Sequence, residues 1–494
     1  MIKKIPRLFL LSSVAVASMT LMSSAMADDA SDTKAQIRNL QQQVDMLKNK
    51  VDAQGAPASS SGGAKEFLKD MQFYGNLDLS VDSTTKGLQS SYPAGVNSPG
   101  GSPAGNMGWM PAISSNLSYL GLKGEHTLEG GMAVVFQLET QLDISATSGT
   151  VNTTSNNDSV VKGGLTSRNS FVGLAGDLGK VKIGKTDAPY KTSTARMNPF
   201  SGMLGDYQVI MSNTGGDNRV EFGTRIDHAI WYESPVKNGL SVNFLYSPGQ
   251  NRNSDNAVQA SGESSCTGGN IPSAGTSHCD DGSYGTATSL NVAYEKGPLY
   301  VTVAYENHSK VNRQGDNTGT PVNDDQFISD ETATKIGVQY RFESKTTVGA
   351  IYEDMKRGTS PVDAALGVNV NERARQGFWL TATQELTPKD NLSVGWAHAY
   401  ATPGDPGTHN SDATANPDNS ANMYTIAYRH FLDKQTSWYA DYATTVNSSG
   451  SHYDLGAGGR GVTTDCHDGG DANTMHCYAG GRLQGVSVGM NYKF

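Results

Sequence analysis

The chain ends with the stretch LQGVSVGMNYKF, Leu483 to Phe494, in which apolar residues alternate with small or polar ones. Successive side chains of an extended strand point to opposite faces, so one face of this stretch is apolar. A soluble sheet would bury that face in a core, whereas a transmembrane barrel turns it to lipid and keeps small and polar groups towards a lumen. The apolar face carries Val486, Val488, Met490, Tyr492 and Phe494, and the other carries Gly485, Ser487, Gly489, Asn491 and Lys493.

Residues 1–27 predict that the chain is exported. They read as a charged start, an apolar stretch and a small-residue cleavage site, namely Lys3, Lys4 and Arg7, then Leu8 to Val16, then Ala25-Met26-Ala27 before Asp28. This is the pattern of a secretory signal peptide. Its removal takes away only positive charge, so the mature chain is more acidic than the formal net charge of −10 of the whole sequence. Nucleic acid is therefore not an expected partner.

The composition favours a barrel over packed soluble domains. After the signal no stretch approaches the ~20 consecutive apolar residues of a membrane helix, and the mean hydropathy is −0.45. Hydrophobic residues make up 36% of the chain and 56 residues are glycine. That content is low for large packed cores but suits a barrel with water inside. Since only helices and closed barrels satisfy the backbone in lipid, the predicted spanning structure is a closed barrel.

The segment directly after the signal predicts a periplasmic coiled coil over residues 28–53. Its apolar residues, Ile37, Leu40, Val44, Leu47 and Val51, recur at spacings of three and four, as at the a and d positions of heptads. So few heptads are marginal alone, and a single amphipathic or disordered segment is the alternative. Residues 54–71 begin with the Gly- and Ser-rich QGAPASSSGGA and predict a flexible linker. The barrel is expected over residues 72–494.

From Gln72 onwards alternation recurs and charge keeps to one face. In the first strand Leu77, Leu79 and Val81 alternate with Asp78 and Asp82. Seven short turns are predicted, at Glu129-Gly130-Gly131, Asp177-Leu178-Gly179, Lys237-Asn238-Gly239, Lys296-Gly297-Pro298, Ser344-Lys345, Pro388-Lys389-Asp390 and Asp433-Lys434-Gln435. Eight long polar segments lie near residues 84–112, 145–166, 187–220, 249–283, 308–332, 357–374, 402–421 and 447–482. Seven turns and eight loops join sixteen antiparallel strands, enough for an aqueous channel with periplasmic turns and external loops.

Several ordered segments resemble the general diffusion porins of Gram-negative bacteria, most closely the neisserial and β-proteobacterial type. They are NLSYLGLKGEHTLEGGMAVVFQLE (Asn116 to Glu139), SRNSFVGLAGDLGKVKIGK (Ser167 to Lys185), MNPFSG (Met197 to Gly202), TRIDHAIWYESP (Thr224 to Pro235) and the terminal Phe494. The resemblance implies an outer-membrane homotrimer in contact with lipid, with one pore for small hydrophilic solutes and ions in each barrel. The amino-terminal heptads depart from the commonest form of the family and keep a substrate-specific channel, for phosphate or another anion, as an alternative.

The resemblance also implies a pore constriction. The third long loop, about Asp187 to Val220, is expected to fold into the lumen, since its apolar residues Phe200, Met203, Leu204, Val209, Ile210 and Met211 are costly to leave in solvent outside. Carried over by motif, Arg168, Lys182 and Arg225 form a basic wall that faces Asp206 on the loop. Related porins often place a further basic residue where this chain has Tyr119, and Lys123 on the same face is the expected substitute. Opposed charges across a narrow aqueous path favour small polar solutes. The alternative is that these are ordinary lumen charges.

The four cysteines predict two disulfides, Cys266 with Cys279 and Cys466 with Cys477, because the cell envelope is oxidising and the count is even. Histidine and aspartate beside them, such as His278 and Asp465, leave a metal site as the alternative, although the spacings match no standard zinc motif. The scattered histidines form no catalytic set, so no enzyme activity and no cofactor are expected. A barrel that mainly tethers the envelope to peptidoglycan through its coiled coil is a further alternative.

Overall fold

The structure is a computed structural model. It describes residues 70–85, 109–142, 144–145, 166–212, 222–248, 284–312, 328–358, 374–401, 418, 420–448, 451, 453–456 and 481–494. The predicted signal peptide, coiled coil, nearly all of the linker and the four cysteines lie outside these residues. Among the described helices, none has the length and apolar character needed to cross a membrane.

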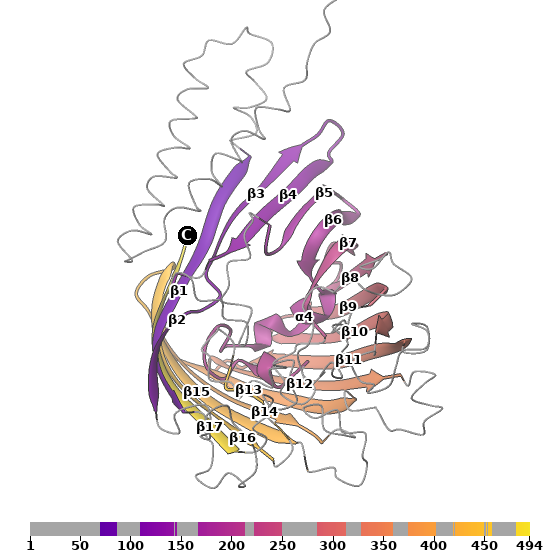
Figure 1. Cartoon of the computed structure of the whole chain (residues 1–494). Helices are drawn as coiled ribbons and strands as arrows, with labels where there is room; N and C mark the ends of the chain where they lie inside the picture. The colour runs from indigo at the N-terminus through magenta and orange to yellow at the C-terminus, as the bar shows by residue number, and fades with distance from the viewer. Residues whose placement is uncertain are drawn as a thin grey trace, which may run out of the picture. The chain divides into compact units, whose positions relative to one another are not determined.

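The described chain is built almost entirely of antiparallel strands (Figure 1). Their bounds are β1 Met71–Thr85, β2 Met110–Ser115, β3 Tyr119–Thr127, β4 Ala133–Gln141, β5 Ser170–Gly176, β6 Gly179–Asp187, β7 Arg225–Glu233, β8 Leu240–Ser247, β9 Thr286–Lys296, β10 Leu299–Asn312, β11 Ile328–Arg341, β12 Thr346–Arg357, β13 Arg375–Thr387, β14 Asp390–Ala399, β15 Ala421–Phe431, β16 Thr436–Asn447 and β17 Gly481–Lys493. From β3 onwards each strand pairs with the next in the sequence, and all seven predicted short turns are confirmed as connections between paired strands.

The sheet closes on itself because β1 pairs with β17, from Asn76 opposite Lys493 to Thr85 opposite Gln484. On its other edge β1 pairs with both β2 and β3. These two are one strand interrupted by a one-residue bulge, in which Asn116 to Ser118 oppose Leu77 and Asp78. The predicted barrel of sixteen antiparallel strands is thereby confirmed, and it has no free edge.

The two faces of the sheet differ as the alternation predicts. Along β17 the outward side chains of Val486, Val488 and Met490 are 44%, 58% and 52% exposed, whereas the inward Ser487 and Asn491 are 1% and 5% exposed. The bulge at Leu117, whose φ is 55°, preserves this arrangement in β2 and β3. Without the extra residue the outward alternation of β2 would turn inward in β3.

The first part of the connection between β6 and β7, residues 188–212, lies inside the ring of strands, where Figure 1 shows its short helix α4 (Pro189–Thr194). We call residues 188–212 the inner loop. It continues through η2 (Ala195–Met197) and η3 (Tyr207–Val209). Its apolar side chains form a buried cluster with the lumen face of the barrel wall, so the prediction that this loop folds inward is confirmed. The loop members of the cluster are Met197, Phe200, Met203, Tyr207, Ile210 and Met211, and its wall members include Ile351, Trp379, Met423 and Tyr439.

Buried polar contacts fix the inner loop to the wall formed by β10 to β13. The Trp379 indole N–H donates to the Met197 carbonyl at 2.9 Å, and the Tyr300 hydroxyl donates to the Ser193 carbonyl at 2.8 Å. Arg375 Nη2 donates to the Ile210 carbonyl at 2.6 Å. Because buried polar groups are costly to leave unpaired, these bonds specify one position of the loop on the wall.

Glu353 on β12 is the centre of this attachment. Its carboxylate accepts from the Tyr190 hydroxyl and the Ser212 amide, both at 2.7 Å, and lies 3.3 Å from Arg375 Nη2. The side chains of Glu353 and Arg375 are fully shielded from solvent. A buried ion pair of this kind holds structure only while both partners are present.

Candidate pore constriction

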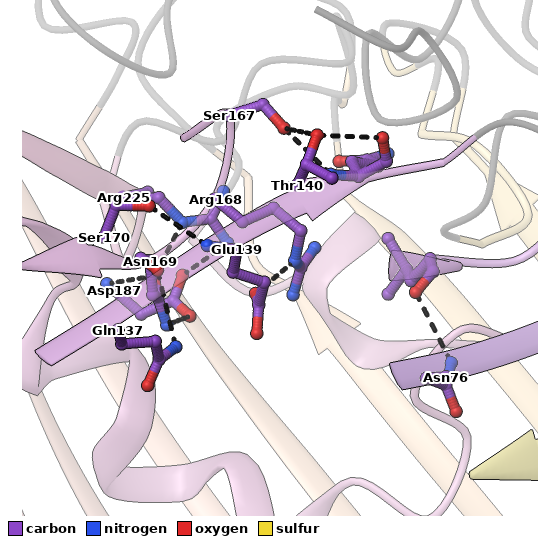
Figure 2. Close-up of polar contacts among 12 residues, drawn as sticks. Asn76, Gln137, Glu139, Thr140, Ser167, Arg168, Asn169, Ser170, Asp187 and Arg225 are labelled. Atoms are coloured by element: carbon purple, nitrogen blue, oxygen red, sulfur yellow. Dashed lines mark hydrogen bonds and ion pairs between the residues drawn. The ribbon is translucent and has the colours of Figure 1, made fainter. Parts of the chain in front are cut away.

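Arg168, directly before β5, is held by an acid and an aromatic ring on the neighbouring strands. Its Nε lies 2.5 Å from Glu139 Oε1 (Figure 2). Its guanidinium lies 4.8 Å from the centre of the Tyr119 ring. The other carboxylate oxygen of Glu139 accepts from the Tyr74 hydroxyl at 2.9 Å. Tyr119 therefore supports Arg168 at the position where related porins often carry a charge, and Glu139 fixes the direction of the guanidinium.

Arg225, at the start of β7, takes part in a second group of charges. Its Nη2 lies 3.2 Å from Asp187 Oδ1, and its Nε donates to Asn169 Oδ1 at 2.7 Å. Lys191 in α4 lies 3.1 Å from the same oxygen of Asp187. Asn169 also donates from Nδ2 to Asp187 Oδ2 at 2.9 Å, so it joins the second group to its chain neighbour Arg168 (Figure 2).

We call Glu139, Arg168, Asn169, Asp187, Lys191 and Arg225 the charged wall. It has three cations, Arg168, Lys191 and Arg225, and two acids, Glu139 and Asp187. Solvent reaches these side chains: Arg168 and Arg225 are 15% and 17% exposed, and Lys191 is 29% exposed. The side chains of the charged wall therefore contact solvent while ion pairs and hydrogen bonds hold them in place.

Of the three basic residues expected to form one wall, the structure brings Arg168 and Arg225 together, whereas Lys182 lies elsewhere. Lys182 Nζ is 2.7 Å from both oxygens of Glu233 and 4.5 Å from the centre of the Phe171 ring. It sits five residues before Asp187 on β6, or about 17 Å at ~3.4 Å per residue, towards the end of the barrel that carries the short turns. The residue pairs with its own acid there and is only 9% exposed.

Asp206 does not face the charged wall across water, which corrects the expectation from sequence. It is 1% exposed, and its carboxylate accepts from the Gln208 amide, the Asn198 side chain and the Gly202 amide at 3.0, 2.8 and 3.3 Å. It caps η3 and stabilises the conformation of residues 202–206, which we call the tip of the inner loop. Burial raises the pKa of this carboxyl, although the hydrogen bonds that it accepts act in the opposite direction.

Lys123 is exposed, as a substitute wall cation requires. Its Nζ lies 4.9 Å from the centre of the Tyr74 ring, and among the described residues no carboxylate is paired with it. Glu139, Asn169 and Lys191 were not expected at the constriction from the sequence. Alternation did place Glu139 on the lumen face, but only the register between strands shows which cation it meets.

Comparison with known proteins agrees with the geometry. The family model for Gram-negative porins matches residues 15–450 of the chain. The major outer membrane protein P.IB of Neisseria sicca is 26% identical over 136 residues, which cover 26% of this chain and 31% of that protein. The chain thus matches about a third of the length of this curated relative.

Solved structures show the same barrel. The anion-selective porin from Comamonas acidovorans aligns with a TM-score of 0.57 and 19% identity, over 86% of this chain and 99% of that chain. Salmonella typhi OmpF, in complex with daunomycin, aligns with a TM-score of 0.51 and 15% identity, over 86% of this chain and 97% of that chain. Since the family model covers most of the sequence, the chain belongs to the Gram-negative porin family and is an outer-membrane barrel rather than an enzyme.

Proposed function

We propose that each barrel forms a water-filled channel for passive diffusion of small hydrophilic solutes and ions, whose narrowest part lies between the charged wall and the inner loop. The observation that carries this proposal is the difference in solvation within one lumen. Charges on β4 to β7 remain partly exposed, while those behind the inner loop on β12 and β13 are fully buried. Water and ions therefore have a path along the charged wall.

The charge balance along this path favours weak anion preference. Three cations face two acids in the charged wall, Lys123 adds an exposed cation, and Asp206 is shielded by its own loop. The similar fold of the Comamonas porin, described as anion-selective, is consistent with this preference. A saturable channel for phosphate or another anion is the alternative, because Arg168, Lys191 and Arg225 lie close enough together to suit an oxyanion.

Planar bilayer recordings of the purified protein test this proposal. Replacing Arg168 and Arg225 together by Ser is expected to raise the relative permeability to cations, most clearly at low salt where screening is weak. Arg341→Ser is the matched control, because Arg341 is 56% exposed near a short turn and pairs with Glu385. If the double variant reverses at the wild-type potential in a salt gradient, these residues are not at the constriction. Saturating block by phosphate would favour the specific channel.

We further propose that three barrels associate. The outward residues of β1, β2, β5, β6 and β17 include strongly exposed aliphatic side chains, namely Val81, Ile113, Val172, Ile183 and Val488, at 55–70% exposure. The outer face of β10 to β15 instead carries exposed aromatic residues such as Tyr305, Tyr352 and Tyr424, which suit contact with lipid headgroups. A trimer that dissociates only on heating is the expected result. Migration as a monomer in mild detergent without heating contradicts it.

The amino-terminal segment and the cysteines remain proposals from sequence. We propose that residues 28–64 clamp the trimer, with attachment to peptidoglycan as the alternative. Deletion of this segment should weaken the trimer and spare the channel in the first case, and release the barrel from isolated cell wall in the second. Peptide mapping without reduction should find Cys266 linked to Cys279 and Cys466 linked to Cys477. Free thiols or other linkages would refute that pairing.

A further inference from the structure

Residues 451 and 453–456, which follow β16, also lie inside the barrel. Thr445 Oγ1 donates to the Asp454 carbonyl at 2.8 Å, and Asn447 exchanges two bonds of 2.9 Å with the Tyr453 backbone. Thr445 and Asn447 face the lumen, since Val446 between them points outward and is 39% exposed. The side chains of Tyr453 and Leu455 are fully buried.

This segment contacts the tip of the inner loop directly. The Gly205 amide donates to the Leu455 carbonyl at 2.8 Å, and Leu204 forms an antiparallel bridge with Gly456. The side chains of Leu204 and Leu455 share a buried cluster with Ala443 of β16 and Leu483 of β17. Two loops that leave the barrel far apart in the sequence are thus joined through their backbones inside it.

The contact is too close for ordinary side chains. A Cβ at Gly456 would lie 2.7 Å from the Gly205 nitrogen, and a Cβ at Gly205 would lie 2.3 Å from the Thr425 hydroxyl on β15. Gly205 also has a φ of 77°, a left-handed conformation that glycine adopts without strain. The tip is therefore held in a narrow space between the wall at β15 and residues 455–456.

We propose that residues 453–456 act as a second internal element of the pore, a clamp that holds the tip of the inner loop away from the charged wall and thereby keeps the channel open. This inference rests on the proposed channel function. The stem of the inner loop is anchored to β10 to β13 through Trp379, Tyr300 and Glu353. Its tip is joined to β15 to β17 through apolar packing and through this clamp.

Because the clamp acts through the inner loop, its residues are positioning residues. Loss of the contact would leave the tip held only by its stem and by the packing of Leu204 on Ala443 and Leu483. The tip would then enter the path beside the charged wall more often. The expected consequence is an unstable open channel rather than an unfolded barrel, since the barrel pairing of β16 with β17 and of β1 with β17 does not depend on the clamp.

Single-channel recordings of the full chain test the clamp. Gly456→Val and the milder Leu455→Ala should each raise the frequency of partial closures, by roughly tenfold if about 1.4 kcal/mol of contact energy is lost. Val446→Ala, on the outer face of β16, is the matched control, and its recordings should be the same as those of the wild type. Migration before and after heating should be unchanged in Leu455→Ala. Steady wild-type openings in both clamp variants would overturn the proposal, while the absence of any channel in the wild type would refute the proposed function instead.

A cross-linking measurement covers the case in which a variant folds poorly. In a background with Ser at Cys266, Cys279, Cys466 and Cys477, the pair Leu204→Cys and Leu455→Cys should be joined by a short bismaleimide in the folded channel. Linkage that leaves openings steady supports the clamp. Failure to link the two residues in a conducting channel would contradict it.

Discussion

Ion pairs occur both in the charged wall and in the wall behind the inner loop, but they have different roles in the two places. Both carry ion pairs on the lumen face of neighbouring strands. Arg375 and Glu353 are fully shielded by the inner loop, whereas Arg225 and Asp187 are 17% and 16% exposed. In the shielded place an ion pair fixes structure, because removal of one partner leaves a buried charge. In the charged wall, where solvent reaches the ion pair, the pair contributes less to stability, and its electric field acts on the ions that pass.

The largest expected effect is at the shielded wall. Glu353→Ala removes the acceptor of Tyr190 and Ser212 and leaves Arg375 buried without its acid, which typically costs about 3–5 kcal/mol. The folded form should unfold at a clearly lower temperature on electrophoresis after graded heating. Glu385→Ala, at the exposed pair with Arg341, should unfold close to wild type. Equal unfolding temperatures for the two variants would show that shielding by the inner loop does not make the Glu353–Arg375 pair more important for stability than an exposed pair.

A second large effect is expected at Trp379, which is fully buried against Phe200 and Tyr207 of the inner loop. Trp379→Ala deletes these ring contacts and the bond to the Met197 carbonyl, and should destabilise by about 3–5 kcal/mol. Noisy, variable conductance is the expected readout together with a lower unfolding temperature. Trp396→Ala on the outer face is the control, and a similar loss there would show that the inner loop is not what Trp379 supports.

A smaller effect on stability and a larger one on selectivity are expected at Asp187. Asp187→Asn removes the acid that Arg225 and Lys191 share. Because these side chains keep some contact with solvent, the cost should be smaller than at Glu353, on the order of 1 kcal/mol. The unfolding temperature should change little, while the reversal potential in a salt gradient should shift towards anions. An unchanged potential would mean that the charged wall does not border the narrowest part of the path.

The smallest effect is expected for Asp206→Asn, and the change in stability relative to wild type depends on pH. A carboxyl whose pKa is raised in the folded chain is most favourable when protonated, so its contribution falls as pH rises through and above the usual aspartate range. Asp206→Asn should therefore be relatively more stable at neutral pH than at acid pH, compared with wild type. Its selectivity should stay near wild type. A clear shift towards anions would restore the role expected from sequence.

Much of the fold follows from local pattern. Alternation over Leu483 to Phe494 determines which face meets lipid, and short glycine- and asparagine-containing turns such as Lys237-Asn238-Gly239 mark the hairpins. The bulge at Leu117 was not predicted, because its cause is a set of lumen contacts: Asn116 Nδ2 donates to Ser80 Oγ and to the Tyr439 hydroxyl. These contacts join residues that are 36 and 323 positions apart in the sequence.

The constriction was only partly predictable for the same reason. The motifs predicted that Arg168 and Arg225 share a wall, and the structure brings them together, but the acids that meet them depend on strand register and on the course of the inner loop. Asp206 resembles a pore acid in sequence, but its carboxylate accepts from the Gln208 amide as the N-cap of η3. The clamp at Leu455 lies in a polar loop whose apolar residues gave no periodic signal.

Accessibility to a water-soluble thiol reagent tests most directly whether the aqueous path follows the charged wall. In the background with Ser at the four native cysteines, Lys191→Cys and Arg225→Cys place a thiol on the charged wall, where the native side chains are 29% and 17% exposed. Ala397→Cys places one on the shielded wall, where the native side chain is fully buried. We predict that the reagent reduces the current through the first two variants and leaves the third unchanged. Block of Ala397→Cys with no block of the other two would contradict the account.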